Sequence, residues 1–496
     1  LEALGQKATD YLPAELEKFK EATGYEEWLD FDPEAVREGL ENPDKSRIDE
    51  MMAFAEKDLR DRGFDCCVLT PGEPHLFRFY EKLGYRADFT RTRTAFSGGT
   101  PITVGEYVRL REQDAWEILP GGKYYVIRGG TAVIAFRVPE QVPKGFMLSA
   151  SHSDHPGFKV KENFELAGTY NRMAVERYGG TLLFTWLDRP LSIAGRVTVE
   201  TEDGIESKLI DIDKDLLLIP NVAIHMNRQV NDGYKWNPAV DTLPLVGSKE
   251  AAGKMQELLE KEAGGKILGH DLFLYPRQKS SVWGVADEYI SSTVLDDLEC
   301  AWGCTQGFLN AKESQSVPVL CVFDSEEVGS GSVQGAASML LPDVLRRICE
   351  SCGWNLDQLL AQSFMISADN AHAIHPNHPE LADPTNAPVM GQGIVLKHNA
   401  NLMYCTDGVS ASIFRKVCNK AGVKVQTYYN RADIPGGSTL GRISLGKVSV
   451  LTADIGLPQL AMHSCYETAA VADAIALEEA MAVYYGSSLE ATENGF

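Results

Sequence analysis

Two adjacent glutamates, Glu326 and Glu327, come after a stretch with the pattern of a buried strand, whose end is marked by Asp324 and Ser325. Residues 319–322 are all apolar, and a turn rich in Gly and Ser comes after the acids. Carboxylates at a strand end are costly to bury unless they are paired or bind a metal ion. In an α/β sheet, the carboxyl ends of the strands are where ligands bind. Neighbouring side chains diverge, so one glutamate could hold a metal ion while the other moves a proton. A solvated acidic turn is the ordinary alternative.

Metal-binding residue types recur at other predicted strand ends and helix starts. Taken singly, each has an ordinary explanation, since a strand-end histidine is often a half-buried polar residue and Asp296 could cap a helix. Together with the glutamate pair they offer two histidines and several carboxylates, a ligand set that suits Zn²⁺, Co²⁺ or Mn²⁺. These positions are His152 and Asp154 in a His-x-Asp motif, the pair Asp296-Asp297, Asp369 and His463.

The set is large enough for two metal ions about 3.5–4 Å apart that share one bridging carboxylate. An aspartate of the 296–297 pair would be the bridge. His152 and Asp369 would bind one ion. Glu327 and His463 would bind the other.

Two acids would remain beside these ligands. Asp154 would hydrogen-bond the far ring nitrogen of His152 and fix its tautomer. Glu326 would be free to act as general base toward the attacking water.

The elements that must position these residues alternate between strand and helix in the second half of the chain. Helices are predicted at 295–311 and 341–353, and strands at 318–324 and 363–369. This alternation predicts an α/β fold, a three-layer α/β domain. Residues 165–275 are mainly short alternating strands, which predicts a β-rich insert that interrupts the domain.

Other elements are expected nearer the two ends of the chain. Residues 124–140 read as a hairpin with Gly-Gly at its turn. A strand is predicted at 146–148, with His152 and Asp154 just past its end. A long apolar-faced helix is predicted at 463–488. The expected domains are residues 1–100, 101–160, 161–275 and 276–496, in which the second and fourth form the catalytic domain.

Composition limits the partners and the compartment. The 496 residues carry 47 basic and 70 acidic side chains, a net charge of −23, which disfavours nucleic acid or an anionic membrane as partner. No apolar run reaches the about 18 residues of a spanning helix. The first residues lack the pattern of a signal peptide. The ten cysteines are scattered, and the Cys-x-x-C at 349–352 closes a predicted helix, so free thiols in a reducing cytoplasm are expected.

The N-terminal part has a different character from the rest. A strand over FDCCVLT and a helix over HLFRFYEKLGY resemble part of a GNAT-type acetyltransferase, with Tyr80 at the position of that family's occasional acid. The glycine-rich pyrophosphate loop is missing upstream, so nothing there would grip the phosphates of the cofactor. A remnant or a partner-binding appendage is therefore expected at residues 50–95.

From residue 107 to the end, the chain resembles metallopeptidases of the aspartyl aminopeptidase family, M18. The matching blocks include ASHSDHPGFKVKEN, YGGTLLFTWLDRPLSIAGRV, VFDSEEVGS, SADNAHAIHPN and GLPQLAMHS. The resemblance implies a zinc-peptidase catalytic domain with a dimerisation or lid insert. It also implies two divalent ions, Zn²⁺ first and Co²⁺ or Mn²⁺ as alternatives, and it selects Asp296 over Asp297 as the bridge. The implied ligands are His152, Asp296, Glu327, Asp369 and His463, with Glu326 as base.

The same resemblance implies substrate-binding roles for four residues, His225, His372, Lys397 and Tyr404. His225, read as lying in an apolar strand context of the insert, would reach the active site of a neighbouring subunit. The implied assembly is a homo-oligomer built from dimers, with a dodecamer as one candidate size. The ordinary alternatives are that Lys397 is a solvated surface residue and that Tyr404 is a residue of the hydrophobic core.

Three departures from the family pattern bear on specificity. His155 stands where serine is usual, Val294 replaces an arginine, and Asp297 stands where asparagine is common. None of them removes a ligand. A buried Lys397 would favour an acidic residue at the first position of the peptide.

The leading hypothesis is a cytoplasmic aminopeptidase with two metal ions that removes N-terminal residues, Asp or Glu among them, from peptides. One alternative is N-acetyltransferase activity of the N-terminal segment. Another is a non-catalytic oligomeric assembly protein. The complete set of metal ligands argues against a non-catalytic assembly protein.

Overall fold

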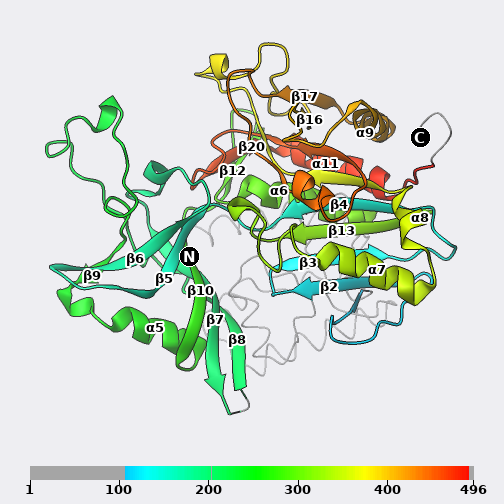
Figure 1. The fold of residues 1–496 in the computed structure, drawn as a ribbon. Coiled ribbons are helices and arrows are strands. Elements are labelled where there is room, and N and C mark those ends of the chain that lie inside the picture. The colour runs from blue at the N-terminus through cyan, green and yellow to red at the C-terminus, as the bar shows by residue number, and fades with distance from the viewer. Residues whose placement is uncertain (1–106, 203, 491–496) are drawn as a thin grey trace, which may run out of the picture. The chain divides into compact units, whose positions relative to one another are not determined.

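The computed structural model describes residues 107–202 and 204–490 (Figure 1). The acetyltransferase-like segment and Tyr80 lie outside the described residues. Within them, no helix is both long and apolar enough to cross a membrane. The eight cysteines in this part of the chain are all free, including the pair at 349 and 352.

A nine-stranded sheet forms the middle layer of the α/β domain, in the order β1-β2-β3-β13-β4-β14-β18-β16-β17. Its four central strands, β13, β4, β14 and β18, run parallel to one another. The predicted hairpin is confirmed as β2 and β3, with positive φ at Gly129 and Gly130 in the turn. The strands are β1 (Val108–Arg109), β2 (Lys123–Arg128), β3 (Ala132–Arg137), β4 (Phe146–His152), β13 (Val317–Phe323), β14 (Phe364–Ala368), β16 (Ile394–His398), β17 (Val425–Tyr429) and β18 (Leu451–Gly456).

Helices cover both faces of this sheet. On one face α6 (Leu295–Asn310), α9 (Gly408–Ala421) and α11 (Val471–Tyr485) share a hydrophobic core with the strands. On the other, α7 (Leu340–Cys352), α8 (Leu356–Leu360) and α10 (Leu440–Leu445) share a second core. The three-layer α/β prediction is confirmed. Because both faces are covered, every residue of β4 is buried and the strand shows no polar alternation.

The strand at β4 is longer than predicted. It continues through small residues to His152, which pairs with Phe323 at the end of β13. Ser149, Ala150 and Ser151 resemble a strand end in sequence, yet all three are buried here. His152 is therefore the last residue of the strand and not a loop residue beyond it.

The β-rich insert is a six-stranded antiparallel sheet, in the order β8-β7-β10-β5-β6-β9. It has its own hydrophobic core around Trp186 and includes a helix, α5 (Lys254–Ala263), that the strand pattern did not predict. The other elements are β5 (Gly157–Leu166), β6 (Tyr170–Tyr178), β7 (Leu191–Thr201), β8 (Gly204–Asp211), β9 (Leu245–Ser248) and β10 (Ile267–Pro276), with short 3-10 helices η2 (Leu183–Trp186), η3 (Val230–Asp232) and η4 (Lys249–Ala251).

Two small sheets lie close to the carboxyl ends of the central strands. One joins β11 (Ser281–Trp283), β12 (Tyr289–Ser292) and β20 (Glu467–Ala470), and the other joins β15 (Ala371–His372) and β19 (Pro458–Gln459). Single 3-10 turns occur at η5 (Glu326–Val328) and η6 (Pro379–Leu381).

The predicted helix at 463–488 was wrong in its first part. The helix α11 begins only at Val471, because residues 467–470 pair with β12 as a strand. His463 precedes this strand and has a positive φ of 66°. The chain therefore reaches the site as an irregular loop, which the apolar periodicity of the helix behind it concealed.

Candidate metal centre

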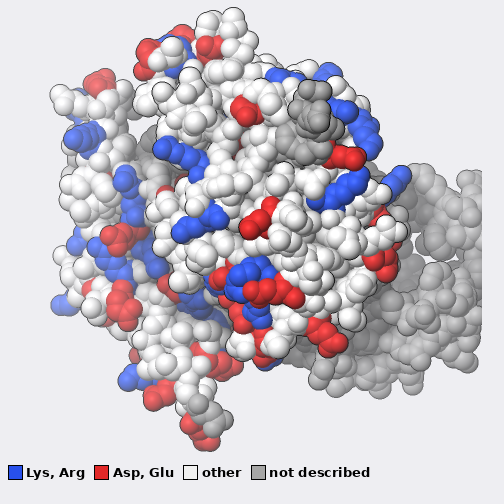
Figure 2. Space-filling model, turned by 45° about the vertical axis from the view of Figure 1, so that its right-hand side comes forward, with Lys and Arg blue, Asp and Glu red and all other residues white. Residues whose placement is uncertain are grey.

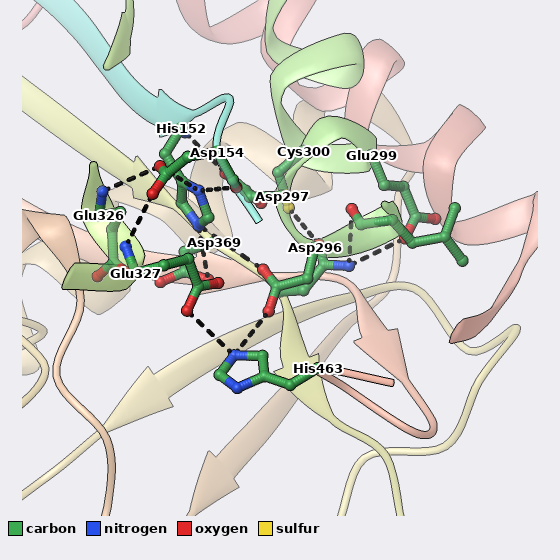
Figure 3. A network of polar contacts seen from close by, with 12 residues as sticks. His152, Asp154, Asp296, Asp297, Glu299, Cys300, Glu326, Glu327, Asp369 and His463 are labelled. Atoms are coloured by element: carbon green, nitrogen blue, oxygen red, sulfur yellow. Dashed lines mark hydrogen bonds and ion pairs between the residues drawn. The ribbon is translucent and has the colours of Figure 1, made fainter. Parts of the chain in front are cut away.

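The predicted site residues meet at the carboxyl edge of the large sheet (Figure 3). His152 ends β4, Asp369 directly follows β14, and Glu326 and Glu327 open η5 just after β13. Parallel neighbouring strands end at the same edge, so their terminal side chains converge there. Asp296 enters from the first turn of α6, and His463 from the loop before β20.

Asp296 lies between the two histidines. Its Oδ1 is 3.7 Å from Nε2 of His152, and its Oδ2 is 3.5 Å from Nε2 of His463. It does not act as a helix cap, since no side-chain capping hydrogen bond is made at the start of α6. The carboxylate is almost fully buried, and its Oδ1 has no hydrogen-bond donor.

The remaining carboxylates divide between the two histidines. Oδ1 of Asp369 is 4.0 Å from Nε2 of His152, and Oε2 of Glu327 is 3.5 Å from Nε2 of His463. Ligand atoms within 4.8 Å of one another define two compact groups that both contain Asp296, one with His152 and Asp369 and the other with Glu327 and His463. A third such group joins His152 with Glu326 and Glu327.

The electrostatics of this cluster fit cations. Burial, followed by nearby carboxylates, raises the pKa of Glu326 to about 8 and that of Glu327 to about 9. Burial lowers the pKa of His463, but the hydrogen bond to Asp296 and the Glu327 carboxylate outweigh it and raise the value to about 9. These acids hold their protons because they are buried and lie near like charge, and divalent ions would favour their ionised forms.

Asp154 connects the first histidine with the glutamate turn. Nδ1 of His152 lies 3.0 Å from the main-chain oxygen of Asp154 and 3.4 Å from its Oδ1. With the proton on Nδ1, the Nε2 that faces Asp296 carries a free lone pair. The Asp154 carboxylate also accepts hydrogen bonds from the main-chain N–H groups of Glu326, at 2.9 Å, and Glu327, at 3.1 Å. This second function of Asp154 is not visible in the sequence.

Comparison with known proteins decides what kind of centre this is. Residues 102–485 match the family model of the aminopeptidase I zinc metalloproteases (M18). The chain belongs to the M18 family. A probable M18 family aminopeptidase 2 of Clostridium acetobutylicum is 42% identical over 395 residues, covering 76% of this chain and 91% of that protein.

Two further relatives extend this comparison. The aspartyl aminopeptidase of Dictyostelium discoideum is 37% identical over 423 residues, covering 74% of this chain and 87% of that protein. The solved dodecamer of Saccharomyces cerevisiae mApe1 superposes with a TM-score of 0.67 at 26% identity, covering 76% of this chain and 89% of that one. The family resemblance is thus confirmed. The protein is a metal-dependent aminopeptidase of a zinc family, and the acetyltransferase and assembly-protein alternatives find no support.

Three further residues support the M18 centre, and two of them, Glu467 and Tyr178, were missed in the sequence. The carboxylate of Glu467 accepts the main-chain N–H of Asp296 at 3.0 Å and that of His463 at 2.7 Å. Asp297 is fully buried and accepts the main-chain N–H of His152 at 3.1 Å. Tyr178 donates its hydroxyl to Asp154 at 2.7 Å. Glu467 lay inside the falsely predicted helix, and no local signal marked Tyr178.

Lys397 and Tyr404 lie beside the Asp369 side of the cluster. The Lys397 ammonium donates to the main-chain oxygens of Asp369, at 2.8 Å, and Asn370, at 3.3 Å, and lies 5.3 Å from the centre of the Tyr404 ring. Both side chains are buried. Lys397 is therefore not a solvated lysine, and it already has oxygen partners within the chain.

The two remaining substrate candidates are exposed. His372 lies on β15, and partial desolvation followed by the Lys397 cation lowers its pKa. His225 lies in a turn whose hydrogen bonds run from Met226 and Asn227 back to Ala223, and not in the strand context that we predicted. The turn begins at Ala223, inside the apolar run, and closes at Met226 and Asn227. His225 belongs to none of the metal-binding groups found among the described residues.

Proposed function

We propose that this M18 aminopeptidase works with two divalent metal ions, Zn²⁺ first among them, that share the carboxylate of Asp296. The observation that supports this most strongly is the arrangement of Asp296, whose two oxygens face different histidines. His152 and Asp369 would complete the ligands of one ion. Glu327 and His463 would complete those of the other.

The residues fit such a pair of ions in kind and in charge. Imidazole nitrogens and carboxylate oxygens are ordinary zinc ligands, and Oδ1 of Asp296 is buried without a donor. Bound ions would polarise the scissile carbonyl group and lower the pKa of the attacking water. Co²⁺ and Mn²⁺ suit the same donors.

Glu326 is the proposed general base. Its carboxylate lies within reach of the cluster, in one group with His152 and Glu327, but it belongs to neither of the two groups centred on Asp296. It would take the proton of the attacking water and deliver it to the leaving amine. Asp154 keeps this turn in place through its two main-chain hydrogen bonds.

The substrate is a peptide with a free N-terminus, and we propose that Asp and Glu are among the residues removed. The likeness to the Dictyostelium aspartyl aminopeptidase supports this preference. The ammonium of Lys397 is engaged by main-chain oxygens, so we expect it to favour an acidic side chain through its field more than through a direct ion pair. His372 and Tyr404 are proposed to contact the peptide near this cation.

We further propose a homo-oligomer in the cytoplasm, built from dimers through the β-rich insert. The domains would be 101–160 and 276–496 for catalysis and 161–275 for dimerisation, with residues 1–100 as a separate segment. The dodecamer of the yeast relative supports such an assembly. His225, exposed on a turn of the insert, would then contribute to the site of a neighbouring subunit.

A panel of aminoacyl amides tests the proposed activity. We expect release of the N-terminal residue, fastest for Asp and Glu, no turnover after chelation, and recovery when Zn²⁺ is added. N-terminally acetylated peptides serve as the matched control and should not be cleaved. Turnover that survives complete chelation would refute the metal-dependent mechanism, and a flat profile across the panel would refute the acidic preference.

A further inference from the structure

A short segment of the insert lies against the catalytic ligands. Residues 178–182, here called the positioning segment, connect β6 with η2. They belong to the β-rich insert, whereas Glu327 and His463 come from the α/β domain. Hydrogen bonds and close packing nevertheless join the positioning segment to both ligands and to Asp154.

The first contact is polar and lies at the start of the segment. Tyr178 donates its hydroxyl to Oδ2 of Asp154 at 2.7 Å, the same oxygen that accepts the main-chain N–H of Glu327 at 3.1 Å. Burial, followed by the Asp154 charge, raises the pKa of Tyr178, so its hydroxyl remains a proton donor. An insert residue thereby takes part in fixing the turn that carries both glutamates.

The second contact is steric and involves two consecutive glycines. A Cβ atom on Gly179 would lie 3.1 Å from Cβ of Glu327, and one on Gly180 would lie 3.1 Å from Nδ1 of His463. Gly179 has a positive φ of 64°, which itself favours glycine. Gly180 has no positive φ, and the atoms within 4 Å of its Cβ position all belong to the His463 ring. The ring is therefore what limits the size of a side chain at residue 180.

The third contact holds the main chain of His463. This residue has a left-handed backbone with φ of 66°, which is unfavourable for a residue with a Cβ and persists only when its surroundings hold it. The N–H of Leu182 donates to the main-chain oxygen of His463 at 2.9 Å, and the N–H of His463 donates to Glu467 at 2.7 Å. The Thr181 hydroxyl donates to the same oxygen at 3.4 Å, so two of these three main-chain contacts of His463 come from the insert.

We infer that the positioning segment sets the places of Glu327 and His463, and therefore controls how tightly one of the two metal ions is held. This inference rests on the proposed ligand assignment. His152 and Asp369, the proposed ligands of the other ion, are not among the nearest neighbours of a Cβ atom at either glycine. Through the two glycines the insert would accordingly tune one ion of the pair selectively, in addition to any part it has in assembly.

The test is a Gly180→Ala variant of the full chain. The added methyl group must displace the His463 ring by a few tenths of an ångström, because the Cβ position is only 3.1 Å from Nδ1. Metal sites tolerate errors of about 0.2 Å in ligand distance, and lost support of a ligand lowers metal affinity by about 10- to 100-fold. We expect the weaker of two zinc-binding steps to lose affinity in this range while the other stays unchanged.

Gly265→Ala is the matched control, because the same substitution in the insert brings a Cβ no closer than 3.7 Å to its neighbours, at Val199. It should bind zinc as the natural chain does. Thermal unfolding of the metal-free variants should agree with that of the natural chain, which separates positioning from general destabilisation.

If Gly180→Ala does not fold, Leu182→Pro provides a second test. Leu182 has φ of −78°, which proline adopts, and the substitution removes the N–H that donates to His463. If both zinc-binding steps keep their affinities in the folded variants, the inference about the positioning segment is overturned but the proposed function is not. A natural chain that binds fewer than two ions would instead overturn the proposed function on which it rests.

Discussion

At the scale of single residues, two adjacent glutamates have different surroundings. Glu327 lies 3.5 Å from Nε2 of His463 and shares a ligand group with Asp296. Glu326 faces His152 from the same turn, and its pKa is raised to about 8, mainly by burial. A general base works best when its pKa is close to the working pH. The pair therefore supports a division into metal ligand and proton carrier.

Glu326→Gln tests this division. The amide keeps the size of the side chain but cannot accept a proton from water. We expect kcat to fall by about 10²- to 10⁴-fold, while zinc content, measured by elemental analysis, stays at the level of the natural chain. Near-normal turnover in this variant would exclude Glu326 as the base.

His463→Ala should affect the metal as well as the rate. Removal of the imidazole leaves Glu327 and Asp296 to hold one ion, so we expect loss of that ion and at least 10²-fold slower hydrolysis. His378→Ala is the matched control, because the exposed His378 ring contacts Glu380 and His375 and belongs to no metal-binding group found among the described residues. Retention of both ions by His463→Ala would contradict the ligand assignment.

At the scale of elements, the sequence predicts how strands and helices supply the ligands but not how the turns are held. Continuous apolar runs predicted β13 and β14, and the helices α6 and α7 lie where their patterns placed them. Parallel strands in an α/β sheet end at one edge, which explains why His152, Asp369 and the glutamates could be predicted to converge. The position of the loop with His463 could not be predicted, because residues 467–470 form a strand only through pairing with β12, which is distant in sequence.

The same limit applies to the supporting side chains. Tyr178 and Glu467 act through main-chain or carboxylate partners far along the chain, at Asp154 and Asp296. No periodicity or motif marks such a contact. The choice of Asp296 over Asp297 likewise needed the family resemblance, since both aspartates are buried and differ only in which atoms they face.

The turn η5 should depend on Asp154. In Asp154→Asn, one of the two main-chain N–H groups of Glu326 and Glu327 would face an amide N–H₂ in place of a carboxylate oxygen. We expect about 10- to 100-fold weaker zinc binding and faster amide hydrogen exchange at Glu326 and Glu327. Asp213→Asn, in an exposed ion pair with Arg277, is the control and should change neither quantity. Unchanged exchange in Asp154→Asn would show that the turn is held by other contacts.

At the scale of the whole molecule, several acidic side chains are buried around the metal-binding cluster, Asp296, Asp297, Asp369 and Glu467 among them. Figure 2 shows one face of the described residues, on which Lys and Arg lie interspersed with Asp and Glu. Buried acids instead gather around the cluster, and burial, followed by the Asp296 charge, raises the pKa of Glu467 to about 8. The stability of the fold should therefore depend on whether metal is bound.

The metal-free protein should become less stable as the pH rises. Glu326, Glu327 and Glu467 have pKa values of about 8 to 9 in the fold, above the ordinary value of 4.5. A raised pKa means that the folded protein binds the proton more tightly than the unfolded chain does. The resulting stabilisation is complete when the pH is below the ordinary pKa of 4.5, and it is lost as the pH rises through the pKa in the fold. Metal binding replaces those protons, so it should stabilise more at high pH.

Melting temperatures measured from pH 5 to pH 9, with and without Zn²⁺, check this dependence. We expect the difference between the two forms to widen with pH. A difference that stays constant or narrows toward pH 9 would show that these carboxyl groups do not compete with metal for protons.

The most direct test of the shared aspartate is anomalous scattering at the zinc edge from crystals of the zinc-loaded protein. We predict two peaks in each chain, about 3.5–4 Å apart, with one oxygen of Asp296 on each. His152 and Asp369 should contact the first peak, and Glu327 and His463 the second. A single peak, or two peaks without Asp296 between them, would contradict the two-ion site.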